Sequence, residues 1–73
     1  MNTRSILGSS VQVGDAIVFL GRAHRISRIV PYVGEAVTSG AIPADSRIAY
    51  EDTGSSRSWG MTLIPSDVVQ VVA

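Results

Sequence analysis

The sequence predicts an all-β fold, a single small barrel of five strands. Glycine and proline recur along the whole chain, and the stretches between them are short and rich in β-branched residues. Such spacing is typical of all-β sandwiches and barrels. A chain of 73 residues suits one domain with a small core. Because the chain has only one Trp, two Tyr and one Phe, that core is expected to be mainly Val, Ile and Leu.

The chain is expected to begin with a flexible N-terminal segment, residues 1–10, followed by the barrel domain, residues 11–73. Gly14-Asp15 is a turn signal, because glycine tolerates positive φ and aspartate hydrogen-bonds its own backbone. The first strand is predicted at Ala16–Leu20. A tight hairpin turn at Gly21-Arg22-Ala23 is expected to follow it.

The second strand is predicted at His24–Tyr32. Its apolar residues Ile26 and Ile29 are three positions apart, which breaks the strict alternation of a strand. A β-bulge at Ser27-Arg28 would turn both of them to the inner face. We therefore expect Phe19, Ile26 and Ile29 to face the core and the arginines of this hairpin to face solvent.

The second half of the chain is expected to add three more strands. Pro31 indicates an edge strand or the end of pairing, since proline has no backbone N–H to donate. A long loop of small and polar residues, Val33–Ser46, precedes the third strand at Arg47–Glu51. The loop Asp52–Ser58 then leads to the fourth strand, Trp59–Ile64.

The last strand, Val68–Val72, follows a turn predicted at Pro65-Ser66-Asp67, where proline presets φ. The segment "IPSDVV", Ile64–Val69, resembles the Pro-Ser-Asn-Tyr-Val motif of the Src-homology-3 fold. "VGDAIVFLG", Val13–Gly21, resembles the opening of bacterial small barrels of the KOW and Tudor type. The resemblance implies a Src-homology-3-like barrel. It does not imply binding of proline-rich peptides, because Val68 stands where that motif has tyrosine.

The final strand is unusual because it is apolar on both faces apart from Gln70. A strand at the surface would alternate apolar and polar residues. Either both of its faces are covered, or one face meets another chain, because exposed apolar edges promote association. A homodimer or larger assembly is therefore one expectation.

Charge and composition narrow the function classes. Six arginines balance six acidic residues, so the chain lacks the basic excess typical of nucleic-acid-binding proteins. The absence of cysteine favours a reducing compartment, and we expect a cytoplasmic protein. No apolar run approaches the roughly 20 residues of a membrane span, and the N-terminus does not resemble a secretory signal. We expect no membrane partner.

The candidate interaction surface is the hairpin that carries Arg22, His24, Arg25 and Arg28. Arginine forks match the geometry of phosphate and carboxylate groups, so these residues could contact a nucleic-acid backbone or an acidic protein. The favoured interpretation is a solvated hairpin whose arginines pair with acidic residues of the same chain, namely Glu35, Glu51 or Asp52.

Trp59 completes this candidate surface. It follows a polar loop at the start of a strand. It could fill the core, or it could offer a platform on which nucleobases stack. The core role is favoured because the chain has so few aromatic residues.

The chain is not expected to be an enzyme. A nucleophile needs a base within hydrogen-bonding reach and a third group that orients the base. His24 is the only histidine, and no paired carboxylates, nucleophile motif or phosphate-binding glycine loop accompanies it. We predict no catalytic residue, no cofactor and no metal site.

The leading hypothesis is a non-enzymatic binding module that acts through a protein partner. Exclusive use of arginine over lysine suggests an accessory protein of a phage or an actinobacterium. One alternative is a nucleic-acid-binding small barrel that uses the hairpin arginines Arg22, Arg25 and Arg28. Another is a structural subunit of a phage particle.

Overall fold

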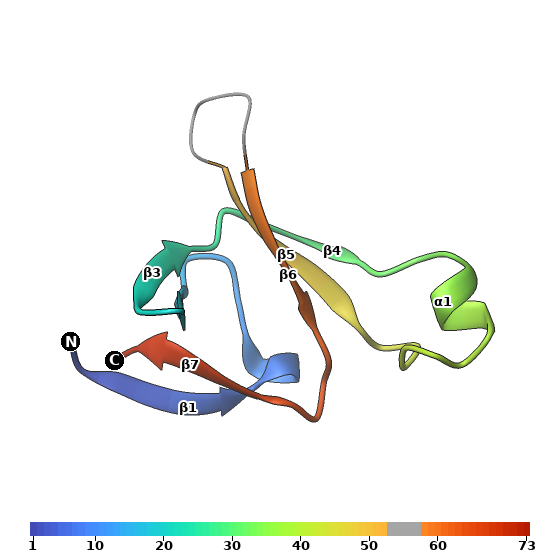
Figure 1. Ribbon diagram of the computed structural model, residues 1–73, viewed down its shortest axis with the longest axis horizontal. Helices are drawn as coiled ribbons and strands as arrows, with labels where there is room; N and C mark the ends of the chain where they lie inside the picture. Colours follow the sequence, from blue (N-terminus) through green and yellow to red (C-terminus); the bar gives the residue numbers. More distant parts are fainter. Residues whose placement is uncertain (53–57) are drawn as a thin grey trace.

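The computed structural model describes residues 1–52 and 58–73 (Figure 1). The described residues form seven strands, one 3-10 turn and one short helix: β1 (Thr3–Leu7), η1 (Gly8–Ser10), β2 (Ala16–Phe19), β3 (Arg22–Arg25), β4 (Arg28–Pro31), α1 (Glu35–Thr38), β5 (Arg47–Asp52), β6 (Ser58–Leu63) and β7 (Val68–Val72). The middle of the predicted polar loop, residues 53–57, lies outside the described residues.

The strands form two antiparallel sheets. Sheet A has the order β1-β7-β2-β3, and sheet B has the order β4-β5-β6. The all-β class predicted from the sequence is therefore confirmed. The strand count is corrected from five to seven, and the strands lie in two separately hydrogen-bonded sheets rather than one closed five-stranded barrel.

One additional strand arises because the predicted second strand is divided. The chain leaves sheet A after Arg25 and enters sheet B at Arg28. Between them, Ile26 is buried and the Ser27 backbone N–H donates to the Tyr50 carbonyl oxygen at 2.9 Å. The expected bulge is thus a corner at which the chain changes sheets. This corner does turn Ile26 inward, as predicted, and Ile29 packs partly buried against the core.

The other additional strand lies at the N-terminus, where a flexible segment was expected. Strand β1 pairs with β7 along its whole length, from Thr3 opposite Val72 to Leu7 opposite Val68. The pairing continues outward, because the Ala73 backbone N–H donates to the Asn2 carbonyl oxygen at 2.9 Å. The two chain ends therefore lie side by side (Figure 1).

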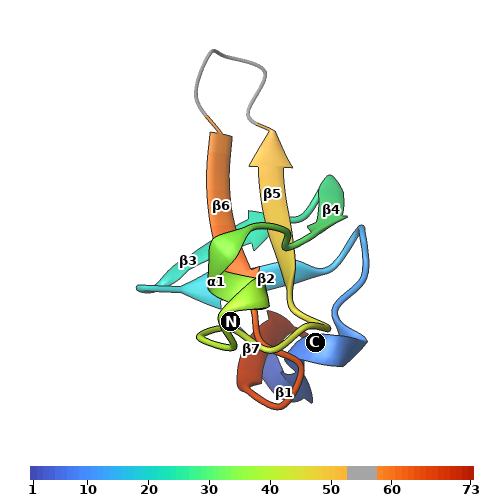
Figure 2. The ribbon, with the colours of Figure 1, turned by 90° about the vertical axis from the view of Figure 1, so that its right-hand side faces the viewer.

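Strands β2 and β3 form a hairpin that extends past β6 (Figure 2). Its turn residues are Leu20 and Gly21, one position earlier than predicted, and both have positive φ, 50° and 78°. Such angles are those of the tight turns that fit the twist of a hairpin. Phe19, expected in the core, is 46% exposed because it lies beside this turn, beyond the end of the core.

The buried core cluster is mainly Val, Ile and Leu, as predicted. It lies between the two sheets and consists of Val11, Ile17, Ile26, Ala49, Leu63, Val69 and Val71. Proline ends β4, at the edge of sheet B, as expected from its missing N–H. The last turn also forms where predicted, with the Asp67 backbone N–H donating to the Ile64 carbonyl oxygen at 3.1 Å.

Candidate interaction site

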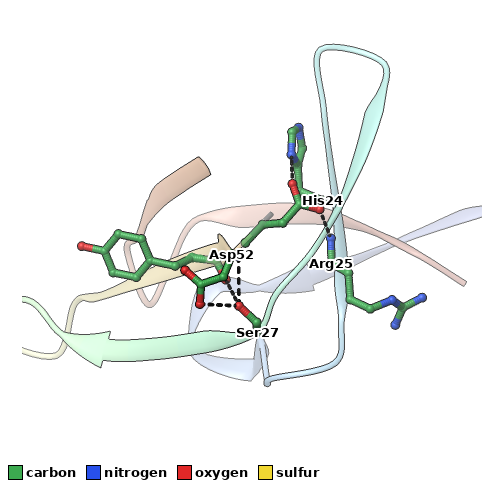
Figure 3. Close-up of polar contacts among 6 residues, drawn as sticks. His24, Arg25, Ser27 and Asp52 are labelled. Atoms are coloured by element: carbon green, nitrogen blue, oxygen red, sulfur yellow. Dashed lines mark hydrogen bonds and ion pairs between the residues drawn. The ribbon is translucent and has the colours of Figure 1, made fainter. Parts of the chain in front are cut away.

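A carboxylate joins the two sheets at the base of the β2–β3 hairpin. His24 lies on the inner face of β3, opposite the buried Ile17, and is itself buried. Its Nδ1 lies 3.0 Å from Oε1 of Glu51, on β5 of the other sheet. A carboxylate only accepts hydrogen bonds, so Nδ1 donates. The second oxygen, Oε2, accepts the backbone N–H of Arg25 at 3.0 Å (Figure 3).

Trp59 lies opposite Glu51 on β6, beside the same contact. Its ring stacks on His24, with 4.0 Å between ring centroids and 10° between planes. Phe19 approaches the indole at 6.0 Å in a tilted arrangement. Phe19, His24 and Trp59 are called the aromatic cluster below. Trp59 is therefore partly buried and packed against the core while it also contributes to this cluster.

The carboxylate of Glu51, which contacts the aromatic cluster through His24, has a lowered pKa. The hydrogen bond from His24 lowers the pKa of Glu51, burial opposes this effect, and the Arg25 N–H and the charge on Arg22 add smaller lowering contributions. The lowered pKa favours the anionic form of Glu51, which is the form that accepts both hydrogen bonds.

The arginines of the candidate surface are divided between two sheets. Arg22 and Arg25 are exposed on β3, whereas Arg28 is on β4. Arg25 Nη1 donates to the Gly14 carbonyl oxygen at 2.6 Å. The guanidinium of Arg28 lies 4.1 Å from the centre of the Tyr50 ring. Two of the three thus make contacts within the chain.

The expected pairing of the arginines with acidic residues is found at Asp52, in a half-exposed ion pair with Arg28 at 3.5 Å. Such surface pairs contribute little to stability. A stronger contact to Asp52 comes from Ser27 at the corner between the sheets, whose hydroxyl donates to Oδ2 at 2.9 Å. This bond, then the one from Arg28, lowers the pKa of Asp52.

The hairpin tip adds two residues that the sequence did not identify as a surface. Leu20 is 87% exposed and is the only non-glycine residue with positive φ in the described part of the chain. It follows Phe19, whose neighbour across the hairpin is Arg22. The only signal in the sequence is the Leu-Gly pair between two apolar-containing strands, which by itself predicts only the end of a strand.

Within residues 1–52 and 58–73, no three His, Asp or Glu side chains come together as metal ligands, and no pocket is formed. Within the same residues, no helix has the length and apolar character needed to cross a membrane.

Comparisons with models of protein families, with curated proteins and with solved structures find no match to this chain.

Proposed function

We propose that this protein is a non-enzymatic binding module that acts through a protein partner, and that the tip of the β2–β3 hairpin is its contact surface. The observation that carries this proposal is Leu20. A large aliphatic side chain stands fully in solvent, at a backbone conformation that leucine rarely adopts. The hairpin turn requires the positive φ but does not require leucine, and exposure of this side chain to solvent does not stabilise the fold.

Backbone strain of this kind is most often found where a residue serves a function. Asparagine or glycine would suit the positive φ of Leu20 better, and a polar residue would suit its exposure. Beside it lie a half-exposed phenylalanine, an arginine and a tryptophan. Aromatic residues and arginine are the types enriched at the centres of protein–protein interfaces.

We also propose that the two sheets are the halves of a Src-homology-3-like barrel. The corner at Ser27 passes the chain from one sheet to the other, as a strongly bent small barrel requires. The Pro65–Asp67 turn then leads into β7, which returns to sheet A. Superposition of an experimental structure on such barrels would test this assignment.

Nucleic-acid binding is the second candidate, and the contacts favour it less. A nucleobase would need an open aromatic face, whereas the Trp59 indole is stacked by His24 and flanked by Phe19. A phosphate backbone would need a row of available arginines, whereas Arg25 contacts the Gly14 carbonyl. Arg22 remains the arginine best placed to contact a ligand at this end, where it would suit an acidic side chain equally well.

The test is photo-crosslinking in the native host, with p-benzoylphenylalanine in place of Phe19. We expect one dominant crosslinked protein. Leu20→Asn should reduce its yield about tenfold, which corresponds to about 1.4 kcal/mol of binding free energy. The same substitution should leave the fold intact or stabilise it, because asparagine tolerates positive φ.

Thr62→p-benzoylphenylalanine is the matched control, because Thr62 is exposed on β6 and distant in sequence from the hairpin. Crosslinks that are equally strong from Thr62, or unchanged by Leu20→Asn, would refute the proposed surface. A gel shift with single-stranded nucleic acid that weakens steeply with salt and is lost in Arg22→Ala would favour the second candidate instead.

A further inference from the structure

The edges of sheet A bear on how this protein assembles. Strand β7, whose apolar sequence suggested an interface, has neighbours on both sides, β1 and β2. Its backbone is therefore not free to pair with another chain. The edge of the sheet is β1, which pairs with β7 on one side only.

The hydrogen bonds at the two ends of the β1–β7 ladder show which groups of β1 are free. The Gly8 N–H donates to the Asp67 carbonyl oxygen at 2.8 Å, and the Ala73 N–H donates to the Asn2 carbonyl oxygen at 2.9 Å. Hydrogen-bonded pairs alternate along an antiparallel ladder, so the even-numbered residues of β1 bond to β7. The N–H and C=O groups of Thr3 and Ser5 and the N–H of Leu7 consequently point away from β7, toward solvent. The Leu7 C=O lies at the N-cap of η1, where it accepts the first hydrogen bond of that turn.

This edge has few of the features that usually prevent pairing. Natural edge strands are protected by proline, by charged side chains, by bulges or by short length. Strand β1 is five residues long, pairs in an unbroken register and carries a single charge, on Arg4. In contrast, β3 carries Arg22 and Arg25, and β4 ends in proline.

The free edge is complementary to itself. If two copies meet about a two-fold axis at Ser5, each Thr3 lies opposite the partner's Leu7, and both are residues with free backbone groups. Arg4 then lies opposite the partner's Ile6 rather than the partner's Arg4, so like charges do not meet. A closed two-fold contact of this kind joins the same surface of both copies.

The outer face of the sheet supports the same arrangement. Leu7 is 48% exposed and lies beside Val68 on β7, which is 66% exposed. At the other end, Thr3 lies beside the exposed Val72. The two-fold pairing would place these residues in one row across the dimer, from Val68 and Leu7 of one copy to Thr3 and Val72 of the other. Cross-strand apolar pairs of this kind stabilise sheets.

We propose that a second copy of this chain binds along β1, in antiparallel register about Ser5, so that sheet A continues through the dimer. This inference does not depend on the proposed role of the hairpin tip, which lies on other strands. Strand β6, the uncharged edge of sheet B, is the competing site, and Thr62 on its exposed face provides the matched control.

The test is sedimentation equilibrium of the untagged protein between about 10 μM and about 1 mM, a range that detects dimers of millimolar or tighter Kd. The wild type should approach twice its 7.7 kDa mass. Ser5→Lys and Ser5→Glu should each remain at 7.7 kDa, because the axis places residue 5 opposite itself. An equimolar mixture of the two variants should regain the dimer, and Thr62→Lys should dimerise like the wild type.

Amide hydrogen exchange gives an independent measurement that needs no variant. The amides of Thr3, Ser5 and Leu7 should be protected at high protein concentration and exchange at least tenfold faster on dilution. Arg4 and Ile6, bonded to β7, should change less. A wild type that stays at 7.7 kDa throughout, association lost in Thr62→Lys but not in Ser5→Lys, or exchange independent of concentration would each overturn the proposal.

Discussion

Apart from the corner at Ser27, the described residues join the two sheets at a glycine junction and a histidine junction, and these are made differently. At the glycine junction, backbone meets backbone: Gly8 packs against the Ile64 carbonyl, and Ser9 N–H donates to the Pro65 carbonyl oxygen at 3.2 Å. Arg47 from sheet B completes it, with Nη2 donating to the carbonyl oxygens of Gly8 and Val11 at 2.7 and 3.0 Å. At the histidine junction, the contacts are made by side chains, those of His24, Glu51 and Trp59.

The difference indicates where this small domain can tolerate amino-acid substitutions. Backbone contacts constrain the positions of the chain itself, so the glycine junction leaves no room for a larger residue. Side-chain contacts can be exchanged or adjusted without moving the strands that carry them. The candidate interaction site adjoins the histidine junction, where change is tolerated more readily. The first three predictions below test this contrast and the fourth concerns a buried residue outside both junctions; they run from the largest expected effect to the smallest.

The strongest test is Gly8→Ala. The added Cβ would overlap the Ile64 carbonyl oxygen, and a backbone atom cannot move aside as the end of a side chain can. We expect a loss of about 3 kcal/mol in the free energy of unfolding, in the upper range for overpacking, measured by urea denaturation. Gly60→Ala is the control, because its Cβ would meet the Tyr50 ring at 3.1 Å. A similar loss in both variants would contradict the contrast.

Arg47→Met tests the side-chain part of the glycine junction. The substitution keeps the aliphatic stem and removes both hydrogen bonds to the carbonyl oxygens of Gly8 and Val11. The expected loss is about 2 kcal/mol, the value for bonds from a charged donor. Thermal unfolding would measure it, and Arg22→Met on the exposed face of β3 is the matched control. Equal melting temperatures for the two variants would show that the Arg47 bonds do not stabilise the junction.

The histidine junction should respond to acid. The pKa of Glu51 is lowered in the folded state, chiefly by His24. Its contribution to stability is therefore fully present above the pKa of the unfolded state and is lost as pH falls through the folded pKa. Glu51→Gln should flatten this acid-induced decrease in the free energy of unfolding. Urea titrations at a series of pH values would measure it, and an unchanged profile in Glu51→Gln would refute the assignment.

The smallest effect is expected at Ser46, a buried residue just before β5. Its hydroxyl oxygen has no hydrogen-bond partner among the described residues. Burial of an unpaired hydroxyl is unfavourable, so Ser46→Ala should raise the free energy of unfolding by up to about 1 kcal/mol. Urea denaturation would measure the change. A decrease of that size would indicate that the hydroxyl is bonded in solution.

The sequence predicts the all-β class and most strand positions because both depend on local signals. Turn residues such as Gly14-Asp15 and Pro65–Asp67 punctuate the chain, and branched aliphatic residues fill the strands between them. The inward position of Ile26 also follows from the local pattern. For Ile26 and Ile29 to face the same side, the chain must bend near Ser27, and the structure shows that the chain changes sheets there.

The sequence does not predict the features that depend on distant partners. Strand β1 contains little apolar sequence, and its strand conformation depends on β7, at the far end of the chain. The contact of His24 with Glu51 spans 27 positions. The sequence suggests Glu51 only as a partner for arginine, since no local pattern shows that histidine faces it across two sheets. The prediction that Phe19 faces the core is wrong because the sequence does not show where the core ends.

The neighbouring chain ends have a practical consequence. Because Asn2 and Ala73 are hydrogen-bonded to one another, the domain could be spliced into a surface loop of a host protein without forcing the two insertion points apart. Joining Asn2 to Ala73 with a short linker and opening the chain elsewhere should likewise yield a circular permutant of the same shape.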